Sequence, residues 1–230
     1  MVEQRQSFVK SNPGDAKRFA NQLTQILATF ERAREWADLS NSLQKLKRAI
    51  DGYPNEPVPV KKELAKRLAQ CLNPDLNVIH SQTIEVYQHI FERERSLMEK
   101  AGTAFEWGGD LGLFYSGLFN FYQYAAFEVK KQFLAFVNDN ILKLEKELLI
   151  CLPGFLLCMI PALEDQNSEL LRRVDSILSQ TEKIVGTSKF FGEIWKTMMR
   201  TPRARLSAIK FLDRKIPKSA KQAAALLDPA

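Results

Sequence analysis

The chain has 230 residues, of which 45% are hydrophobic and 26% charged, and its formal net charge is +6. That balance predicts a well-cored globular chain of one or two domains. The three cysteines, Cys71, Cys151 and Cys158, form no C-x-x-C pair and lie among apolar residues, which argues against a disulfide framework and predicts reduced thiols. The polar N-terminus lacks the apolar segment of a secretory signal, so a cytoplasmic location is expected.

Apolar residues recur at helical spacing along the chain, and no segment alternates convincingly as a strand would. A first helix is expected to begin near Pro13, which suits a first helical turn, and a second to run from Trp36 to Ile50. The proline-rich stretch 51–60 is the clearest linker-like loop. Further helices are predicted at about 61–72, 78–95, 111–149, 151–163, 168–185, 188–199 and 203–216, with 111–149 divided near 127–130.

Helices of this length, joined by short connections, favour antiparallel pairs stacked side by side. The predicted fold class is therefore all-α: a right-handed stack of antiparallel helix pairs, like the α-solenoids of HEAT and armadillo repeats. Residues 13–221 are expected to form this helical-repeat domain after a flexible N-terminus at 1–12. Residues 222–230 are expected to be a C-terminal extension that leads into a much larger protein.

The longest apolar run is LLICLPGFLLCMIPAL at 148–163. It is shorter than the roughly 20 residues that a membrane span needs, and it contains Pro153, Gly154 and Pro161. A core helix is the better interpretation. The residues predicted to form its buried stripe are Leu152, Phe155, Leu156, Met159 and Leu163.

The segment LFYSGLFNFYQYAAF, 113–127, is unusually rich in aromatic residues and could be a bilayer wedge, a platform for stacking bases or part of the core. A helix that is apolar nearly all round is a buried one, and no basic residue lies between Asp110 and Glu128 to support base stacking. We therefore predict a buried helix, in which Gly117 lets a neighbouring backbone approach closely. Its predicted core stripe is Leu111, Phe114, Leu118, Phe121, Tyr122 and Ala125.

Catalytic chemistry has little support. The only histidines, His80 and His89, are nine residues apart on one predicted helix, so they point to opposite sides and cannot share a metal on that helix. Each is expected at a helix interface or facing solvent. We expect no enzymatic activity, no catalytic residue, no cofactor and no metal.

Charge is more informative than any motif. The segment from Arg200 to Lys221 holds eight basic residues against one acid, Asp213, which makes it +7 and leaves about −1 for the rest of the chain. A localised basic patch attracts a polyanion. The predicted partner is an anionic membrane surface; the alternatives are nucleic acid and a solvated face without a partner. Excess absorbance at 260 nm in the purified protein would favour nucleic acid.

Helical phase divides these basic residues. With Arg203 at 0° and 100° per residue, Lys210 and Arg214 fall within about 20° of it, while Leu206, Ile209, Leu212 and Ile216 fall between about 180° and 300°, the predicted buried sector. Arg205 lies in that apolar sector, so a structural role is expected for it, held by a carboxylate or by the carbonyl end of a neighbouring helix. The residues predicted to bind lipid are Arg203, Lys210, Arg214, Lys215, Lys218 and Lys221.

Six stretches in order along the chain resemble the N-terminal region of the Dopey family. They are EWADL (35–39), KRLAQCLNPDL (66–76), TIEVYQHIF (83–91), LFYSGLFNFYQYA (113–125), LPGFLLCMIPALED (152–165) and TPRARLSAIKFL (201–212).

The resemblance implies an N-terminal domain of a very large, largely helical-repeat protein, peripheral on the cytoplasmic face of Golgi and endosome membranes. It implies a non-enzymatic adaptor or scaffold acting in endosome-to-Golgi traffic. The implied partners are a large scaffold related to Arf exchange factors, an aminophospholipid flippase and, through a further link, kinesin. The implied lipid is a phosphoinositide such as phosphatidylinositol 4-phosphate, and no nucleic acid is expected.

Overall fold

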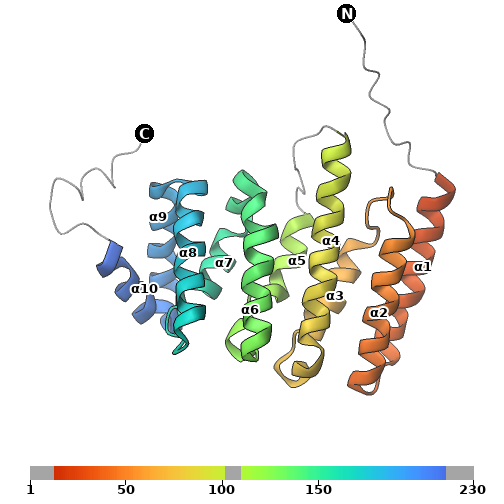
Figure 1. Ribbon diagram of the computed structural model, residues 1–230, viewed down its shortest axis with the longest axis horizontal. Coiled ribbons are helices and arrows are strands. Elements are labelled where there is room, and N and C mark those ends of the chain that lie inside the picture. The colour runs from red at the N-terminus through yellow and green to blue at the C-terminus, as the bar shows by residue number, and fades with distance from the viewer. Residues whose placement is uncertain (1–12, 102–109, 216–230) are drawn as a thin grey trace, which may run out of the picture. The chain divides into compact units, whose positions relative to one another are not determined.

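The computed structural model describes residues 13–101 and 110–215, and within these ranges the secondary structure is helical, without strands. The prediction of an all-α fold is thereby confirmed. The chain divides into two compact units, residues 1–117 and 118–230 (Figure 1). The predicted flexible N-terminus at 1–12 and extension at 222–230 lie outside the described residues.

The first unit is built from five α-helices and one 3₁₀ segment within its described residues. They are α1 (Pro13–Arg32), α2 (Trp36–Gly52), α3 (Lys61–Cys71), η1 (Pro74–Ile79), α4 (His80–Ala101) and α5 (Asp110–Leu118), the last of which ends one residue beyond the unit.

Helices α1 and α2 lie side by side as an antiparallel pair, which Figure 1 shows in red and orange. Helix α1 buries one apolar face, formed by Phe19, Leu23, Ile26, Leu27 and Phe30. The two helices are joined by a hydrogen bond of 2.8 Å between the Thr29 and Ser42 hydroxyls. Helix α2 begins after Glu35. The Asp38 carboxylate in its first turn accepts hydrogen bonds from the backbone N–H groups of Arg34 and Glu35, at 3.1 and 3.4 Å, so donors at the start of the helix are satisfied. Local capping and one apolar face thus suffice to form this pair.

The linker-like loop is held against α4. Val58 is buried, and its backbone N–H donates to the Glu94 carboxylate at 2.7 Å. Glu94 is itself buried and pairs with the Lys61 ammonium at 3.2 Å, while the Arg93 guanidinium donates to the Ile50 carbonyl at 2.7 Å. Buried charges of this kind are stable only when paired and hydrogen-bonded, so this loop is a fixed part of the unit.

The second unit packs a further series of helices. They are η2 (Tyr122–Tyr124), α6 (Phe127–Phe136), the π-helical η3 (Val137–Ile141), η4 (Leu142–Glu147), α7 (Leu148–Ala162), α8 (Ser168–Val185), α9 (Thr187–Arg200) and α10 (Pro202–Lys215).

Helix α7 is the core of the second unit. Every residue of its predicted stripe is buried, and so are Cys151 and Cys158, which together with the buried Cys71 are free thiols as predicted. Packing against α8, α9 and α10 explains why α7 is apolar on nearly every side. Within the described ranges no helix combines the length and the apolar character that crossing a membrane requires.

The predicted core stripe of the aromatic segment is buried where its side chains are described, but Tyr124 and Phe127 are exposed and the segment is not one helix. Its α-helix ends at Leu118, and a 3₁₀ turn with an extended Ala125 follows. Phe114, Leu118, Phe121, Tyr122 and Ala125 are all buried. The side chain of Leu111 is not among those described.

The break divides the rings between two clusters. Phe114 meets Tyr87 edge-on at 6.2 Å in the first unit, while Phe121 meets Phe133 at 5.2 Å in the second. A segment that is apolar all round has no contrast between its faces, so its periodicity could not locate the break.

The prediction that Gly117 lets a neighbouring backbone approach closely is confirmed. A Cβ added there would lie 2.3 Å from the Cβ of Ala69 and 2.7 Å from its Cα, so α5 and α3 approach too closely for any side chain.

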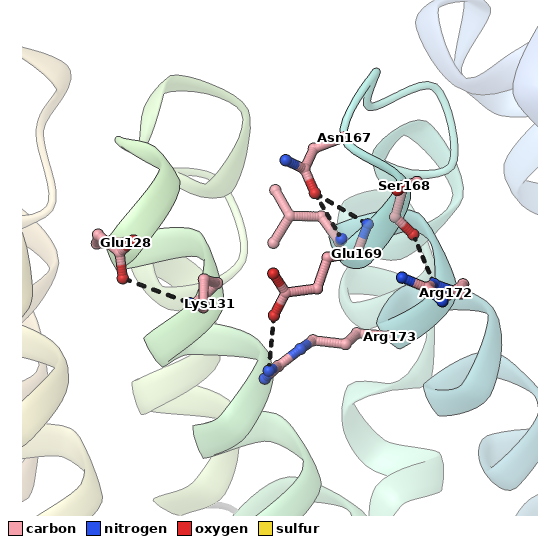
Figure 2. Close-up of polar contacts among 8 residues, drawn as sticks. Glu128, Lys131, Asn167, Ser168, Glu169, Arg172 and Arg173 are labelled. Carbon is pink, nitrogen blue, oxygen red and sulfur yellow. Dashed lines mark hydrogen bonds and ion pairs between the residues drawn. The ribbon is translucent and has the colours of Figure 1, made fainter.

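Helix α8 begins and ends at the predicted residues. Figure 2 shows the Asn167 side chain accepting hydrogen bonds from the backbone N–H groups of Glu169 and Leu170, at 2.9 and 3.2 Å, in an N-cap. One turn on, Glu169 pairs with Arg173 at 2.9 Å. The helix ends at Gly186, whose φ of 87° favours glycine and turns the chain into α9.

A single residue, Thr201, joins α9 to α10. Its backbone N–H donates to the Thr197 carbonyl at 2.9 Å and so completes the last turn of α9. Pro202 then opens α10, where its missing N–H costs nothing. Helix α10 packs against both α9 and α7.

Candidate functional site

Helix α10 carries most of the residues singled out by charge. Arg203, Lys210 and Arg214 are all exposed on it. The Lys210 ammonium lies 3.4 Å from a Glu164 carboxylate oxygen, and the Arg214 Nε donates to the Lys210 carbonyl at 3.4 Å. Arg203 has no carboxylate partner in the described part of the chain. These three cations therefore lie along one side of α10, and Arg203 keeps its charge unpaired.

The remaining predicted lipid-binding residues are placed differently. Lys215 is half-buried: its ammonium donates to the Ser179 hydroxyl of α8 at 3.2 Å and lies 5.8 Å from the centre of the Phe211 ring. Its side chain is thus drawn toward α8, away from the other cations. Lys218 and Lys221 lie outside the residues that the structure describes.

The predicted buried sector of α10 was wrong at two of its four residues, whereas Leu212 is buried as predicted and Ile216 lies outside the described residues. Leu206 and Ile209, expected in the core, are 58% and 49% exposed. The buried residues are Ala204, Ser207, Ala208, Phe211 and Leu212. Small side chains on that face let α10 approach α7 and α9 closely, and the larger apolar residues are left outside.

Arg205 does not lie in an apolar sector, because the sector itself was misplaced. The side chain is exposed, and its Nε donates to the Met198 carbonyl, in the last turn of α9, at 3.3 Å. It does meet the carbonyl end of a neighbouring helix. Its structural role stays a prediction.

These placements define the outer face of α10, where two apolar side chains are flanked by cations. By helical phase, Arg205 lies on one flank of the apolar pair and the other three cations lie on the opposite flank. The residues of the outer face of α10 are Arg203, Arg205, Leu206, Ile209, Lys210, Asp213 and Arg214.

A shallow hollow of about 660 Å³ borders this face. The residues just after α7 supply Leu163 and Glu164, and α10 supplies Leu206, Lys210 and Arg214 among its lining residues. Sequence reasoning missed both the hollow and the apolar pair. The alternation of small and large apolar residues in RARLSAIKFL is the signal that could have found them, since close helix packing selects the small ones.

The histidines lie apart on α4. His80 is buried, with its Nε2 2.9 Å from the Asn73 carbonyl, whereas His89 is half-exposed and pairs with Asp51. Among the described residues no three His, Cys, Asp or Glu side chains come together as a metal site would require. Burial raises the pKa of Cys71 to about 12, so this thiol is held in its inert, protonated form.

Known proteins match this chain over most of its length. Residues 14–227 match the family model described as "Dopey, N-terminal". The chain is 34% identical over 197 residues to Protein DOP1B of Mus musculus, covering 84% of this chain and 8% of that protein. It is 31% identical over 204 residues to Protein pad-1 of Caenorhabditis elegans, covering 87% and 8%, and 30% identical over 196 residues to the Protein DOP1 homolog of Drosophila melanogaster, covering 84% and 7%. The chain thus spans less than a tenth of the length of these relatives. No solved structure matches it.

Proposed function

Because the chain belongs to the Dopey family over residues 14–227, we propose that it is a non-enzymatic trafficking domain that docks on anionic membranes through the outer face of α10. The activity proposed is attachment: the domain holds a larger protein at a membrane and presents surfaces to partner proteins. The family resemblance supports the trafficking role, and the charge and exposure of α10 support the membrane.

The observation that carries this proposal is the composition of the outer face of α10. Leu206 and Ile209 are exposed between Arg205 on one flank and Arg203, Lys210 and Arg214 on the other. Membrane-surface helices combine a few apolar side chains, which enter the headgroup boundary, with cations attracted to anionic lipids. A solvated face with no partner would not need large apolar residues there, and base stacking would need aromatic ones.

The site of action that we propose is the cytoplasmic face of Golgi and endosome membranes, with phosphatidylinositol 4-phosphate as the first lipid to test. Partner proteins of the class implied by the resemblance are a scaffold related to Arf exchange factors, an aminophospholipid flippase and kinesin. Which of them contacts this domain is a question for pull-down with the isolated chain.

For the packing of the helices we propose an α-solenoid of antiparallel helix pairs. Within each unit, helices contact their neighbours in the chain, such as α1 with α2 and α8 with α9, and this order supports the proposal. Small-angle scattering of the chain tests it. An elongated particle is expected, and a sphere-like one would contradict the solenoid.

Vesicle flotation tests the membrane assignment. Reversing Arg203, Lys210 and Arg214 to glutamate is expected to weaken binding to phosphatidylserine or phosphatidylinositol 4-phosphate vesicles about a hundredfold, since each basic residue near an anionic surface contributes about 1 kcal/mol. The matched control reverses three other exposed cations, Lys45, Arg48 and Lys66, and changes the net charge equally.

Equal loss in both triple variants would mean that net charge, not the outer face of α10, drives binding. Unchanged binding at low salt in the α10 variant would contradict the membrane assignment and leave protein partners. Co-purified nucleic acid, lost in the same variant, would replace the membrane with the nucleic-acid alternative.

A further inference from the structure

A second cavity in the same unit lies beside the outer face of α10. It is a half-open pocket of about 200 Å³, and its lining comes from the turn after α5, from α6, from the C-terminal half of α7 and the residues after it, and from the start of α10. Its apolar lining includes Phe119, Leu157 and Pro161. Its charged and hydroxyl-bearing lining residues are Tyr122, Lys130, Glu164, Asp165 and Arg203. Drug-sized ligands occupy roughly 300–1,000 Å³, so this pocket suits a smaller group.

The Tyr122 hydroxyl is the least expected of these groups. The side chain is 3% exposed, and no described residue gives the hydroxyl a hydrogen bond. A buried hydroxyl without a partner is unfavourable, and such atoms in native proteins usually meet a water or a ligand. Burial raises the pKa of Tyr122, and the negative charge of Asp165, which also lines the pocket, raises it further, so the hydroxyl stays a donor.

The charged groups that line the pocket differ in whether a described residue pairs with them. The Lys130 ammonium donates to Asp165 at 2.8 Å and lies 5.3 Å from the centre of the Tyr122 ring, and Glu164 pairs with Lys210. Asp165 also accepts from the Asn167 backbone N–H at 3.0 Å. Both carboxylates therefore have partners, whereas Arg203 has none among the described residues. The groups left for a ligand are donors: the Arg203 guanidinium, the Tyr122 hydroxyl and the remaining N–H bonds of Lys130.

These donors select both the sign and the size of the ligand's charge. An oxyanion would accept hydrogen bonds from Arg203 and Tyr122. Lys130 pairs with Asp165 and Lys210 with Glu164, so one negative charge on a ligand balances the remaining cation, Arg203, whereas a second would face Glu164 and Asp165 without compensation. A singly charged phosphodiester fits this arrangement better than a doubly charged phosphate monoester.

Arg203 and Glu164 connect the pocket to the outer face of α10, which we propose as the membrane-docking surface. Arg203 belongs to the outer face of α10, and Glu164 lines both the pocket and the hollow beside that face. We propose that the pocket receives the phosphodiester of a phospholipid headgroup, bound by Arg203, the Tyr122 hydroxyl and Lys130. This inference rests on the proposed membrane docking, and it adds a defined site for one lipid to a general electrostatic attraction.

Titration of the chain with glycerophosphoglycerol, the soluble deacylated headgroup of phosphatidylglycerol, tests the pocket by NMR chemical-shift changes. Saturable binding is expected. Arg203→Gln should raise Kd about tenfold or more, and Tyr122→Phe about threefold to tenfold, because they remove a charged and a neutral donor respectively. The controls are Tyr124→Phe, an exposed tyrosine outside the pocket, and Arg214→Gln on the outer face, both expected within about twofold of the parent.

Melting temperatures of the free variants separate binding from folding. Because the Tyr122 hydroxyl has no hydrogen-bond partner among the described residues, Tyr122→Phe should leave Tm unchanged or raise it, and the ligand-induced rise in Tm should shrink. A fall in Tm of the free variant without any change in Kd would overturn the role given to the hydroxyl.

Other probes decide the source and charge of the ligand. Inorganic phosphate binding as tightly as glycerophosphoglycerol would overturn the lipid assignment in favour of a free oxyanion, and tighter binding of a short polyglutamate peptide would replace lipid with an acidic protein segment. Binding of glycerophosphoinositol 4-phosphate more than tenfold tighter than glycerophosphoglycerol would overturn the single-charge argument.

The two proposals fail separately. No saturable headgroup binding, with vesicle flotation intact, overturns the pocket and leaves the docking face. Headgroup binding with no flotation overturns the docking face instead.

Discussion

Helices α7 and α10 pack against each other, yet they bury residues according to different properties. Helix α7 buries large apolar side chains on nearly every side. Helix α10 buries Ala204, Ser207 and Ala208 beside Phe211 and Leu212, and it leaves Leu206 and Ile209 exposed. Where a helix is surrounded, hydrophobicity predicts burial. Where a helix lies at the surface, the distance to its neighbours decides, and small residues can displace large ones from the interface.

The largest effect is expected at the centre of α7. Phe155 is fully buried and meets Phe119 edge-on at 5.8 Å, so Phe155→Ala should cost about 3–5 kcal/mol of unfolding free energy. Ile150→Ala on the same helix, at a position 51% exposed, should change it by less than about 0.5 kcal/mol. Urea unfolding measures both. Similar costs for the two variants would contradict the picture of a surrounded helix that is exposed only at Ile150 and Pro153.

At Gly117, helices α5 and α3 approach so closely that no side chain fits between them. Gly117→Ala should cost about 1–3 kcal/mol or more, because the new Cβ would overlap Ala69. Gly112, on the same helix, has nothing within 4 Å of an added Cβ, and Gly112→Ala should stabilise by about 0.5–1 kcal/mol through helix propensity. Opposite signs from two glycines of one helix are expected in thermal unfolding.

Helix α10 itself carries a small buried residue, Ala208, and a large exposed one, Leu206. Ala208→Leu puts extra volume into the small-residue face and should cost about 1–3 kcal/mol, whereas Leu206→Ala on the outer face should cost less than about 0.5 kcal/mol. Denaturant midpoints at equal m-value test the pair. If Leu206→Ala is the more damaging change, then hydrophobicity, not distance, determines which residues α10 buries.

An ion pair after α7 should show as a pH dependence. Burial alone would raise the pKa of Asp165, but hydrogen bonds from Lys130 and the Asn167 backbone, with the Lys130 charge, lower it below its ordinary value. A lowered folded pKa stabilises the fold above the unfolded value of about 3.9 and loses that stability as pH falls through the folded pKa. Asp165→Asn should therefore cost about 1 kcal/mol at pH 7 and progressively less below about pH 4. A pH-independent cost would mean that the ion pair is not responsible.

The smallest effect is expected at Arg205. Its one hydrogen bond, to the Met198 carbonyl, lies at an exposed position, so Arg205→Ala should cost about 0.5 kcal/mol. Arg203→Ala, without such a bond, should leave the melting temperature unchanged. A cost above about 2 kcal/mol at Arg205 would restore the buried role that helical phase had assigned to it.

Helix bounds were predicted best from the sequence where a helix has one apolar face and one polar face. Helix α8 has one apolar face and a capping asparagine, and both of its ends were predicted correctly. The stretch 111–149 lacks such contrast. It was predicted to divide near 127–130, but these residues are the first turn of α6, and the stretch divides earlier, between Leu118 and Phe127, and again after Phe136. On α10, charge correctly marked three exposed cations, but assigning Leu206 and Ile209 to the core ignored the size of their neighbours. The pocket around Tyr122 was out of reach, because its lining comes from four separate segments that only tertiary packing brings together.

The one-residue joint between α9 and α10 has a mechanical consequence. Pro202 fixes its own φ and restricts the conformation of Thr201 before it, so few torsions remain free between the two helices. A force on α10 is therefore transmitted to α9, because few backbone torsions between the two helices can change to absorb it. Whatever holds the outer face of α10 also sets the direction in which α9 points.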